Sequence, residues 1–225
     1  MISVKNLTKT YGEKVVYKDF NIDIEENQIL VVLGESGSGK TTLLSVLAGL
    51  TDYQGQITGD LSPISMLFQK DFLVPNLTVE QNISLVCNQD ATPMLERFGL
   101  LDSAKSYPKS LSAGMSRRVA IIRALLYDSR VLLMDEPTNS LDIGLKRLTY
   151  EMLKEQKFKC RKTIVIVTHD VDEALSLADR VVVLKSGEIV YSYTFKTGLN
   201  ERDITGAECN LVRKSLIDRL IGNKI

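Results

Sequence analysis

The sequence predicts an α/β protein with a mostly parallel core sheet, and three observations support that prediction. Four short apolar runs are each followed at once by a polar residue, and they span residues 28–33, 64–68, 131–134 and 163–168. Continuous apolar runs of this length are typical of strands buried on both faces, as in parallel sheets. Segments with helical spacing lie between them. Because open α/β sheets bind ligands beyond the carboxyl ends of their strands, the four polar ends are expected to meet at one edge.

Helices and a second sheet are expected around this core. Apolar residues recur at helical spacing in residues 40–50 and again after residue 112, with the stripes Leu43, Leu47, Leu50 and Val119, Ile122, Leu126. The first 27 residues alternate and predict antiparallel strands. Residues 70–115 predict a helical insertion, and residues 211–221 a short amphipathic terminal helix.

Composition excludes several classes of protein. Lys+Arg and Asp+Glu both number 28, so the net charge is zero and nothing points to nucleic-acid binding. The aliphatic runs are far shorter than the roughly 20 residues of a membrane-spanning helix, and the first residues lack the apolar centre of a signal peptide. The three scattered cysteines, Cys87, Cys160 and Cys209, indicate reduced thiols. If the protein serves a membrane, it is expected to dock onto one.

A phosphate-binding loop follows the first apolar run. Residues 34–41, GESGSGKT, match G-x-x-x-x-G-K-[ST] between a predicted strand and a predicted helix, the context that supports the motif. The glycines let successive backbone N–H groups point at an anion, and the helix N-terminus adds partial positive charge. Lys40 is expected to reach the β- and γ-phosphates, and the Thr41 hydroxyl to ligate Mg²⁺. The fold is therefore predicted to be that of a P-loop NTPase.

Two carboxylates and a histidine follow later strands. Asp135 is placed to ligate Mg²⁺, and the adjacent Glu136 could activate the water that attacks the γ-phosphate. An Asp-Glu pair can also simply end a strand, but beside a phosphate loop the catalytic interpretation is favoured. His169, the only histidine, stands where it could hydrogen-bond the γ-phosphate and help orient that water.

Taken together, these motifs resemble those of the ATP-binding cassette (ABC) transporter ATPases over nearly the whole chain. Leu111–Met115, LSAGM, stands where the family has its LSGGQ signature, 24 residues before Asp135. Gln69 matches the Q-loop, residues 140–142 the D-loop, and His169 the switch histidine. Tyr11 matches the aromatic residue that stacks on adenine. No single motif is specific, but all of them in this order are.

The resemblance implies a set of site residues and a mechanism. Catalysis is assigned to Glu136, His169, Gln69 and Lys40, and Mg²⁺ to Thr41, Gln69 and Asp135. ATP binding is assigned to Tyr11, Gly34, Glu35, Ser36, Gly37, Ser38, Gly39, Lys40, Thr41, Thr42 and Asp142. Two subunits would meet head to tail, with Ser112 and Gly114 of one facing the ATP of the other at a second helix N-terminus. Hydrolysis would then open the pair.

The resemblance also implies a division of the chain and partners. Residues 1–70 and 116–195 would form the ATP-binding core with its antiparallel β subdomain, 71–115 the helical subdomain with the signature, and 196–225 a C-terminal tail. The partners implied are a second ATPase subunit, identical or not, integral membrane permease subunits and an extracytoplasmic solute-binding protein, at the cytoplasmic face of the cell membrane. Phe72, Leu73 and Leu77 either cover the insertion's own core or line the groove for the permease.

Departures from the family pattern bear on the type of transporter. Ala113 replaces the first signature glycine, which requires a negative φ there, and Met115 replaces the glutamine. Met at this position, the short span between Lys40 and Gln69, and residues 72–77, 169–174 and 202–220 resemble importers for nitrate, sulfonates, taurine and thiamine precursors. Residues 137–140 instead resemble lipoprotein-release and efflux subunits. A soluble cassette ATPase and a non-catalytic member of a heterodimer are the further alternatives.

Overall fold

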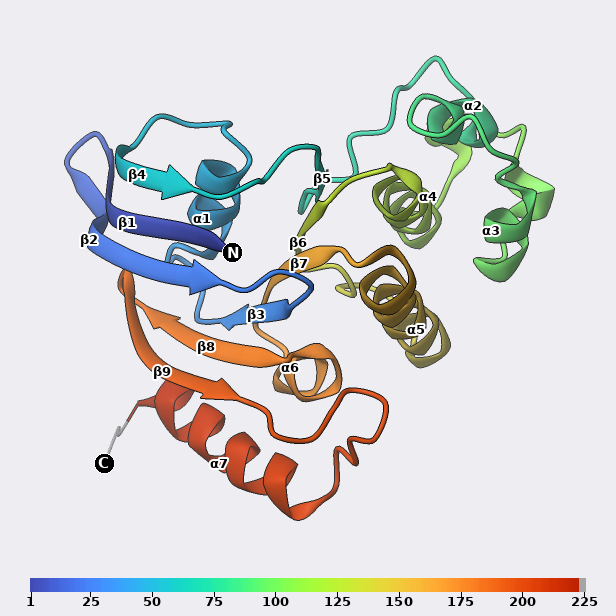
Figure 1. Cartoon of the computed structure of the whole chain (residues 1–225). Helices are drawn as coiled ribbons and strands as arrows, with labels where there is room; N and C mark the ends of the chain where they lie inside the picture. Colours follow the sequence, from blue (N-terminus) through green and yellow to red (C-terminus); the bar gives the residue numbers. More distant parts are fainter. Residues whose placement is uncertain (223–225) are drawn as a thin grey trace.

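The computed structural model describes residues 1–222, and within them the chain forms two sheets flanked by helices (Figure 1). The core sheet has the strand order β5-β6-β7-β3-β8-β9. Its strands are β3 (Ile29–Leu33), β5 (Ile64–Leu67), β6 (Val131–Asp135), β7 (Thr163–Thr168), β8 (Arg180–Lys185) and β9 (Glu188–Thr194). All pair in parallel except β9, which forms an antiparallel hairpin with β8. The predicted α/β class with a mostly parallel sheet is confirmed.

The second sheet is the predicted N-terminal antiparallel one. It has the order β2-β1-β4, with β1 (Ile2–Tyr11), β2 (Lys14–Ile24) and β4 (Gln54–Thr58). The alternation that predicted the first two strands is seen in their burial, because Ile22 and Ile24 point inward while Asn21 is exposed. The strand β4 was not predicted, since its sequence QGQIT carries little apolar signal.

The two faces of the core sheet bury different partners. Successive residues of a strand point to opposite faces, so Leu30 and Val32 pack with the antiparallel sheet and α1 (Lys40–Leu47). Ile29 and Val31 pack on the other face. That face is covered by α4 (Ala113–Leu126), α5 (Ile143–Cys160), α6 (Val171–Leu177) and α7 (Ala207–Ile221). The sheet is thus buried on both sides, which explains its uninterrupted apolar strands.

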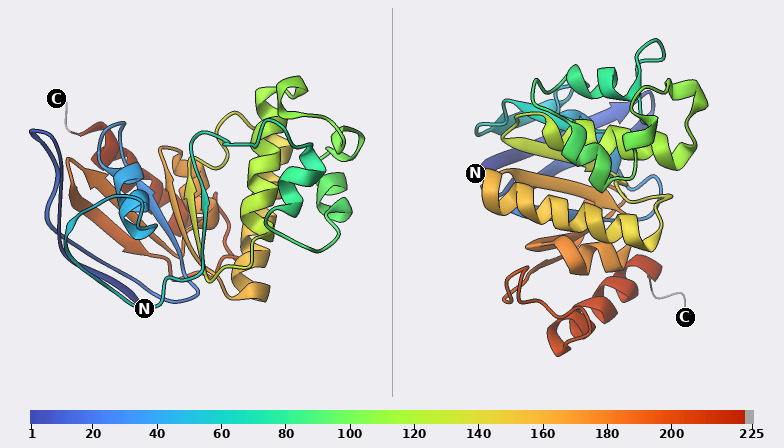
Figure 2. Two further views of the ribbon diagram at one scale, coloured as in Figure 1. Left: turned by 90° about the horizontal axis from the view of Figure 1, so that it is seen from above. Right: turned by 90° about the vertical axis from the view of Figure 1, so that its right-hand side faces the viewer.

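The predicted insertion is helical and projects from the core (Figures 1 and 2). It contains α2 (Val79–Ser84), α3 (Thr92–Arg97) and two single-turn 3₁₀ helices, Leu101–Ser103 and Pro108–Ser110. Thr78 starts α2 with a capping box, in which its hydroxyl accepts from the Gln81 N–H. The helix α2 packs against α4, so the insertion is joined to the core through α4.

Helix ends differ from the sequence-based prediction at two places. The helix α1 ends at Leu47 rather than at residue 50, because Gly49 takes a left-handed φ of 68° and Leu50 is exposed. The helix α7 begins at Ala207, four residues before the predicted start, and its first turn was missed because it carries few apolar residues. The division of residues 1–225 into core, helical subdomain and tail stays a prediction, and residues 223–225 of that tail lie outside the described residues. No helix within residues 1–222 is long and apolar enough to cross a bilayer.

Candidate active site

The phosphate loop joins the central strand β3 to α1 and is held from two sides. A Cβ on Gly34 would lie 2.5 Å from the Leu184 carbonyl oxygen, so only glycine allows this approach of the loop to β8. Gly39 takes a φ of 111° directly before the helix. Its carbonyl oxygen accepts a 2.9 Å hydrogen bond from the buried hydroxyl of Tyr17 on β2. The loop conformation is therefore fixed by both sheets.

The side chain of Lys40 lies along the inside of this loop. Its Nζ donates to the carbonyl oxygens of Gly34 and Glu35, at 2.6 and 2.9 Å. Burial lowers the pKa of the Lys40 ammonium, while the charges of Glu136 and Asp135 act in the opposite direction. A phosphate bound in the loop would place negative charge beside the ammonium and so offset the energetic cost of burying it.

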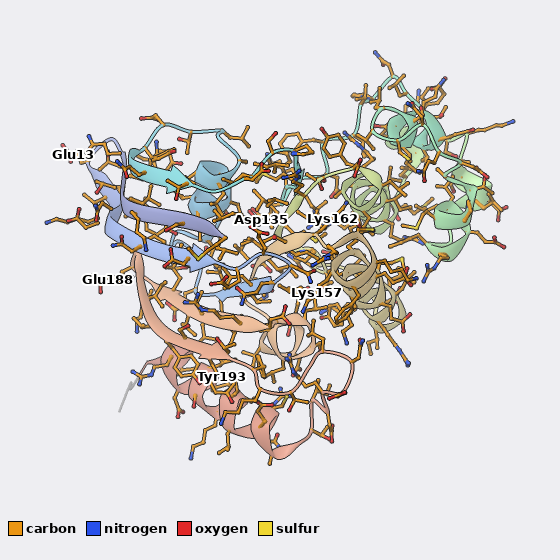
Figure 3. The ribbon with its side chains drawn as sticks, in the orientation of Figure 1. Glu13, Asp135, Lys157, Lys162, Glu188 and Tyr193 are labelled. Carbon is orange, nitrogen blue, oxygen red and sulfur yellow. The ribbon has the colours of Figure 1, made fainter. Side chains whose placement is uncertain are left out.

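The end of β6 carries the predicted metal ligand. Asp135 is 3% exposed, lies near the middle of the molecule (Figure 3), and accepts a 2.7 Å hydrogen bond from the Thr41 hydroxyl. Burial raises the pKa of the Asp135 carboxyl, and the Thr41 hydrogen bond acts against that shift. A buried carboxylate beside a hydroxyl is a donor set that suits Mg²⁺, which prefers oxygen ligands and retains waters and substrate oxygens. The residues present therefore fit that ion.

Glu136 and His169 meet at the same edge of the sheet. A carboxylate oxygen of Glu136 lies 2.9 Å from His169 Nδ1, and the other accepts from the Thr168 hydroxyl at 3.3 Å. The backbone of Glu136 has a φ of 49°, a strained value for a residue other than glycine. Its N–H donates to the Val167 carbonyl oxygen at 2.9 Å. These contacts turn the carboxylate away from the Asp135 side and toward the histidine.

One cavity of about 420 Å³ gathers most of the predicted site residues. Tyr11, half exposed on β1, and Gln69, which follows β5, both line it. The cavity is lined by Tyr11, Lys14, Val16, Ser36, Gly37, Gly39, Lys40, Thr41, Thr42, Gln69, Asp135, Glu136, Asn139 and His169. Gly34, Glu35 and Ser38 lie in the loop behind this lining. The expected convergence of strand ends at one edge is observed.

Three further predicted residues lie outside both the cavity lining and the phosphate loop. Ser112 is exposed and caps α4, its hydroxyl accepting from the Met115 N–H at 3.2 Å. Gly114 lies in the first turn of the same helix, with open space where a Cβ would stand. Asp142 caps α5 by accepting from the Leu145 N–H at 2.9 Å. Ser112 and Gly114 do not line this chain's own cavity, and their assignment to the site of a partner stays a prediction.

The altered signature keeps helical geometry. Ala113 is the first residue of α4 and is not among the residues with positive φ, as its side chain requires. Met115 packs against the apolar core at the base of the helix. Neither substitution removes a backbone N–H from the helix start.

Five residues at the site were not predicted: Lys14, Val16 and Asn139 line the cavity, and Tyr17 and Arg117 contact its loops from behind. Tyr17 was overlooked because a tyrosine in an alternating strand is typical of any sheet. Arg117 was overlooked because arginine is rarely buried without a partner, and only the fold shows that its guanidinium lies behind Asp135 and Glu136. Nothing in the local sequence distinguishes Arg117 from the exposed cations of an amphipathic helix.

Comparison with known proteins decides the family. The model of the ABC transporter family matches residues 17–139, more than half of the chain. The chain belongs to the ABC transporter family. It is an ATP-binding subunit that hydrolyses ATP. The matched span runs from β2 to the loop after Glu136, so it contains the phosphate loop, Gln69 and the signature.

Two import ATPases and one solved cassette structure are among the proteins that are similar to this chain. The aliphatic sulfonates import ATP-binding protein of Paracoccus denitrificans is 42% identical over 195 residues, covering 84% of this chain and 81% of the relative. The spermidine/putrescine import ATP-binding protein of Haemophilus ducreyi is 34% identical, covering 86% of this chain and 58% of the relative. A solved dimeric ABC cassette in a post-hydrolysis state with ADP and phosphate is 30% identical, covering 88% of this ABC chain and 100% of the other, with a TM-score of 0.78.

Proposed function

We propose that this ATPase powers the import of a small anionic organic solute, with aliphatic sulfonates as the favoured class. The 42% identity to a sulfonate-import ATPase over most of both chains is the observation that carries this proposal. The importer pattern of Met115 and of residues 72–77 supports the same direction. The polyamine-import relative supports a second solute class, because its cassette region is also similar to this chain.

ATP binding is assigned to the phosphate loop and to other residues that line the cavity. Lys40 and the loop N–H groups hold the phosphates, since they present positive charge in a partly desolvated site. Tyr11 offers a half-exposed ring for the adenine. Thr41, Asp135 and Gln69 would hold Mg²⁺, which supplies charge neutralisation of the phosphate oxygens when bound.

Hydrolysis is assigned to Glu136 and His169. The Glu136 carboxylate accepts a proton from the attacking water, and a general base of this kind contributes about 10²–10⁴ in rate. The contact at 2.9 Å between His169 Nδ1 and Glu136 holds the carboxylate in one orientation. The same imidazole is exposed, and in its doubly protonated form Nδ1–H donates to Glu136 while Nε2–H can donate to a γ-phosphate.

Two subunits are proposed to share the nucleotides. Ser112 at the helix start is exposed, Gly114 is half-buried, and neither lines the chain's own cavity, so this helix N-terminus can face a phosphate held by another subunit. The solved relative is described as dimeric in a nucleotide-bound state, which supports this arrangement. Asp142 and the exposed Ile143 at the start of α5 would lie at the same contact.

A groove beside the insertion is proposed to receive a cytoplasmic helix of the permease. It holds about 230 Å³ between β5 and α4, and its lining is mostly apolar. Phe72 is 63% exposed there, and the lining also includes the charged residues Asp71 and Arg123, the latter donating to the Phe72 carbonyl oxygen. Leu73, in contrast, packs against the core, so the two roles left open by the sequence are proposed to fall to different residues. This docking would place the chain at the cytoplasmic face of the membrane.

Reconstitution in liposomes tests the import direction and the solute. The chain is combined with its permease and solute-binding protein, and ATP hydrolysis is measured with the binding protein inside or outside the vesicle. We expect stimulation when the binding protein carrying an alkanesulfonate is on the side opposite the ATPase. Stimulation by spermidine instead would support the polyamine alternative. Movement of solute from the ATPase side of the membrane to the opposite side would contradict import.

A further inference from the structure

Arg117 on α4 is buried, and its guanidinium is surrounded by oxygen acceptors from two other segments. The side chain is 6% exposed. Its five donor contacts are Nε to the Pro137 carbonyl at 3.3 Å, Nη1 to the Phe68 carbonyl at 2.6 Å and to Asp71 Oδ1 at 3.2 Å, and Nη2 to the carbonyls of Asp135 at 2.8 Å and Glu136 at 2.6 Å. Hydrogen bonds to a charged donor are stronger than neutral ones, so this is a stiff connection.

These acceptors lie at two strand ends that carry reacting groups. Phe68 directly precedes Gln69, which lines the nucleotide cavity after β5. The carbonyls of Asp135 and Glu136 belong to the acidic pair after β6. A single planar guanidinium therefore fixes the spacing between the Q-loop and the carboxylates. An ammonium could hold fewer of these acceptors at once, because its three donors do not form a planar fork.

The bond to the Glu136 carbonyl holds a strained peptide. Glu136 has a φ of 49°, and left-handed residues other than glycine persist only where the surroundings impose them. Two contacts do so, namely the N–H of Glu136 to the Val167 carbonyl at 2.9 Å and its carbonyl to Arg117 at 2.6 Å. If the second were lost, the peptide could turn, and the carboxylate would turn with it.

We propose that Arg117 is a positioning residue for ATP hydrolysis, which holds the Glu136 carboxylate and Gln69 in register behind the nucleotide cavity. The proposal rests on the proposed role of Glu136 in activating water. Arg117 does not itself line the cavity, so it acts on turnover through these two segments and leaves nucleotide binding to the phosphate loop.

Lys162 provides a matched control. Like Arg117 it is a buried cation that donates to backbone carbonyls, but its acceptors lie at one helix end, Leu125 at 3.4 Å and Tyr127 at 2.8 Å. Leu125 is the last but one residue of α4 and Tyr127 is the residue after the helix, and none of the three lines the nucleotide cavity (Lys162 is labelled in Figure 3). Loss of either cation leaves buried carbonyls without a partner, so both variants should lose stability.

The experiment compares Arg117→Gln and Lys162→Gln in steady-state ATP hydrolysis and thermal unfolding. For Arg117→Gln we expect kcat to fall about 10- to 100-fold, as for a misplaced catalytic group, with the KM for ATP within about threefold of the wild type. For Lys162→Gln we expect a comparable fall in Tm and a kcat within about twofold, because only stability is lost. If Arg117→Gln does not fold, Arg117→Lys, which keeps the charge, is measured and should show the same split with a smaller loss.

Three results would overturn the proposal. They are an unchanged kcat in a folded Arg117 variant, a rise in KM with kcat intact, and a loss of kcat in Lys162→Gln equal to that in Arg117→Gln. ATP turnover of Glu136→Gln, measured in the same experiment, distinguishes a failure of the Arg117 proposal from a failure of the proposed function. If Glu136→Gln retains turnover, the role of Glu136 is wrong, whereas loss of turnover there with an active Arg117→Gln contradicts only the inference.

Discussion

Glu136 shows how a single residue combines backbone strain with chemistry. Its left-handed φ lets the carboxylate reach His169 while Asp135, the preceding residue, stays against Thr41. In an extended strand, neighbouring side chains point to opposite faces, so the turn at Glu136 is what keeps both carboxylates at one edge. Strain of this kind costs about 1–3 kcal/mol and is typical of functional sites.

Replacement of Glu136 by Gln should separate nucleotide binding from hydrolysis. The amide keeps the size of the side chain but cannot accept the proton of water, so turnover should fall at least about 100-fold. ATP should still bind, and the variant should accumulate as a dimer with Mg-ATP on gel filtration.

Lys40→Ala in the same background is the control for that dimer. Without the ammonium the phosphates lose their main cation, so the ATP-dependent dimer should not form. A Glu136→Gln variant that remains monomeric at saturating Mg-ATP would argue against shared nucleotides.

At the scale of the element, α6 carries a buried carboxyl beneath the active site. Glu173 is 1% exposed and accepts a 2.9 Å hydrogen bond from the Thr138 hydroxyl. Burial raises the pKa of Glu173 to about 7, the hydrogen bond from Thr138 opposes this, and the charges of Asp170 and Glu136 add to it. The carboxyl thus links the helix after His169 to the loop after Glu136.

Glu173→Gln should change how stability depends on pH. The pKa is raised in the folded state, so the folded protein holds a proton that the unfolded chain releases from about pH 4.5 upward. That contribution is fully present below this pH and is lost as the pH rises through about 7. Glutamine removes the titration, so the Tm of Glu173→Gln relative to wild type should increase between pH 5 and 8.

Thermal unfolding of both proteins across that range is the measurement. The folded-state pKa of about 7 and the ordinary value of 4.5 differ by an amount that corresponds to roughly 3 kcal/mol in the free energy of unfolding between these two pH values. A Tm difference that is independent of pH would contradict the raised pKa of Glu173.

At the scale of the whole molecule, the groove between β5 and α4 joins the Q-loop to the surface of the insertion. Phe72→Ser should weaken association with the permease, because it removes an exposed ring from the groove. ATP hydrolysis by the isolated subunit should stay within about threefold, since Phe72 lies outside the nucleotide cavity. Co-purification with the permease measures this association.

Leu101→Ser provides the comparison for that variant. Leu101 is 45% exposed on the same insertion but does not line the groove, so its loss should leave the permease bound. Equal effects of the two substitutions would contradict docking at the groove.

Prediction from sequence succeeded where chemistry imposes spacing. The phosphate loop, Asp135, Glu136 and His169 could be placed because each follows a strand whose apolar run is continuous. The strand β4 and the early start of α7 were not predicted, because their apolar pattern is weak and long-range pairing determines them. Arg117 and Tyr17 contact the site through segments distant in sequence, and no local pattern reveals that.

The strand order has a consequence for synthesis of the chain. The strand β3, which ends in the phosphate loop, is hydrogen-bonded only to β7 and β8 among the residues described, and both are made after residue 160. A nascent chain that has just completed Glu136 therefore carries nearly every motif but has no neighbour for the strand that bears the loop. Non-local pairing of this kind forms slowly. The chain should therefore become able to bind a nucleoside triphosphate only late in its synthesis, when most of the polypeptide has left the ribosome.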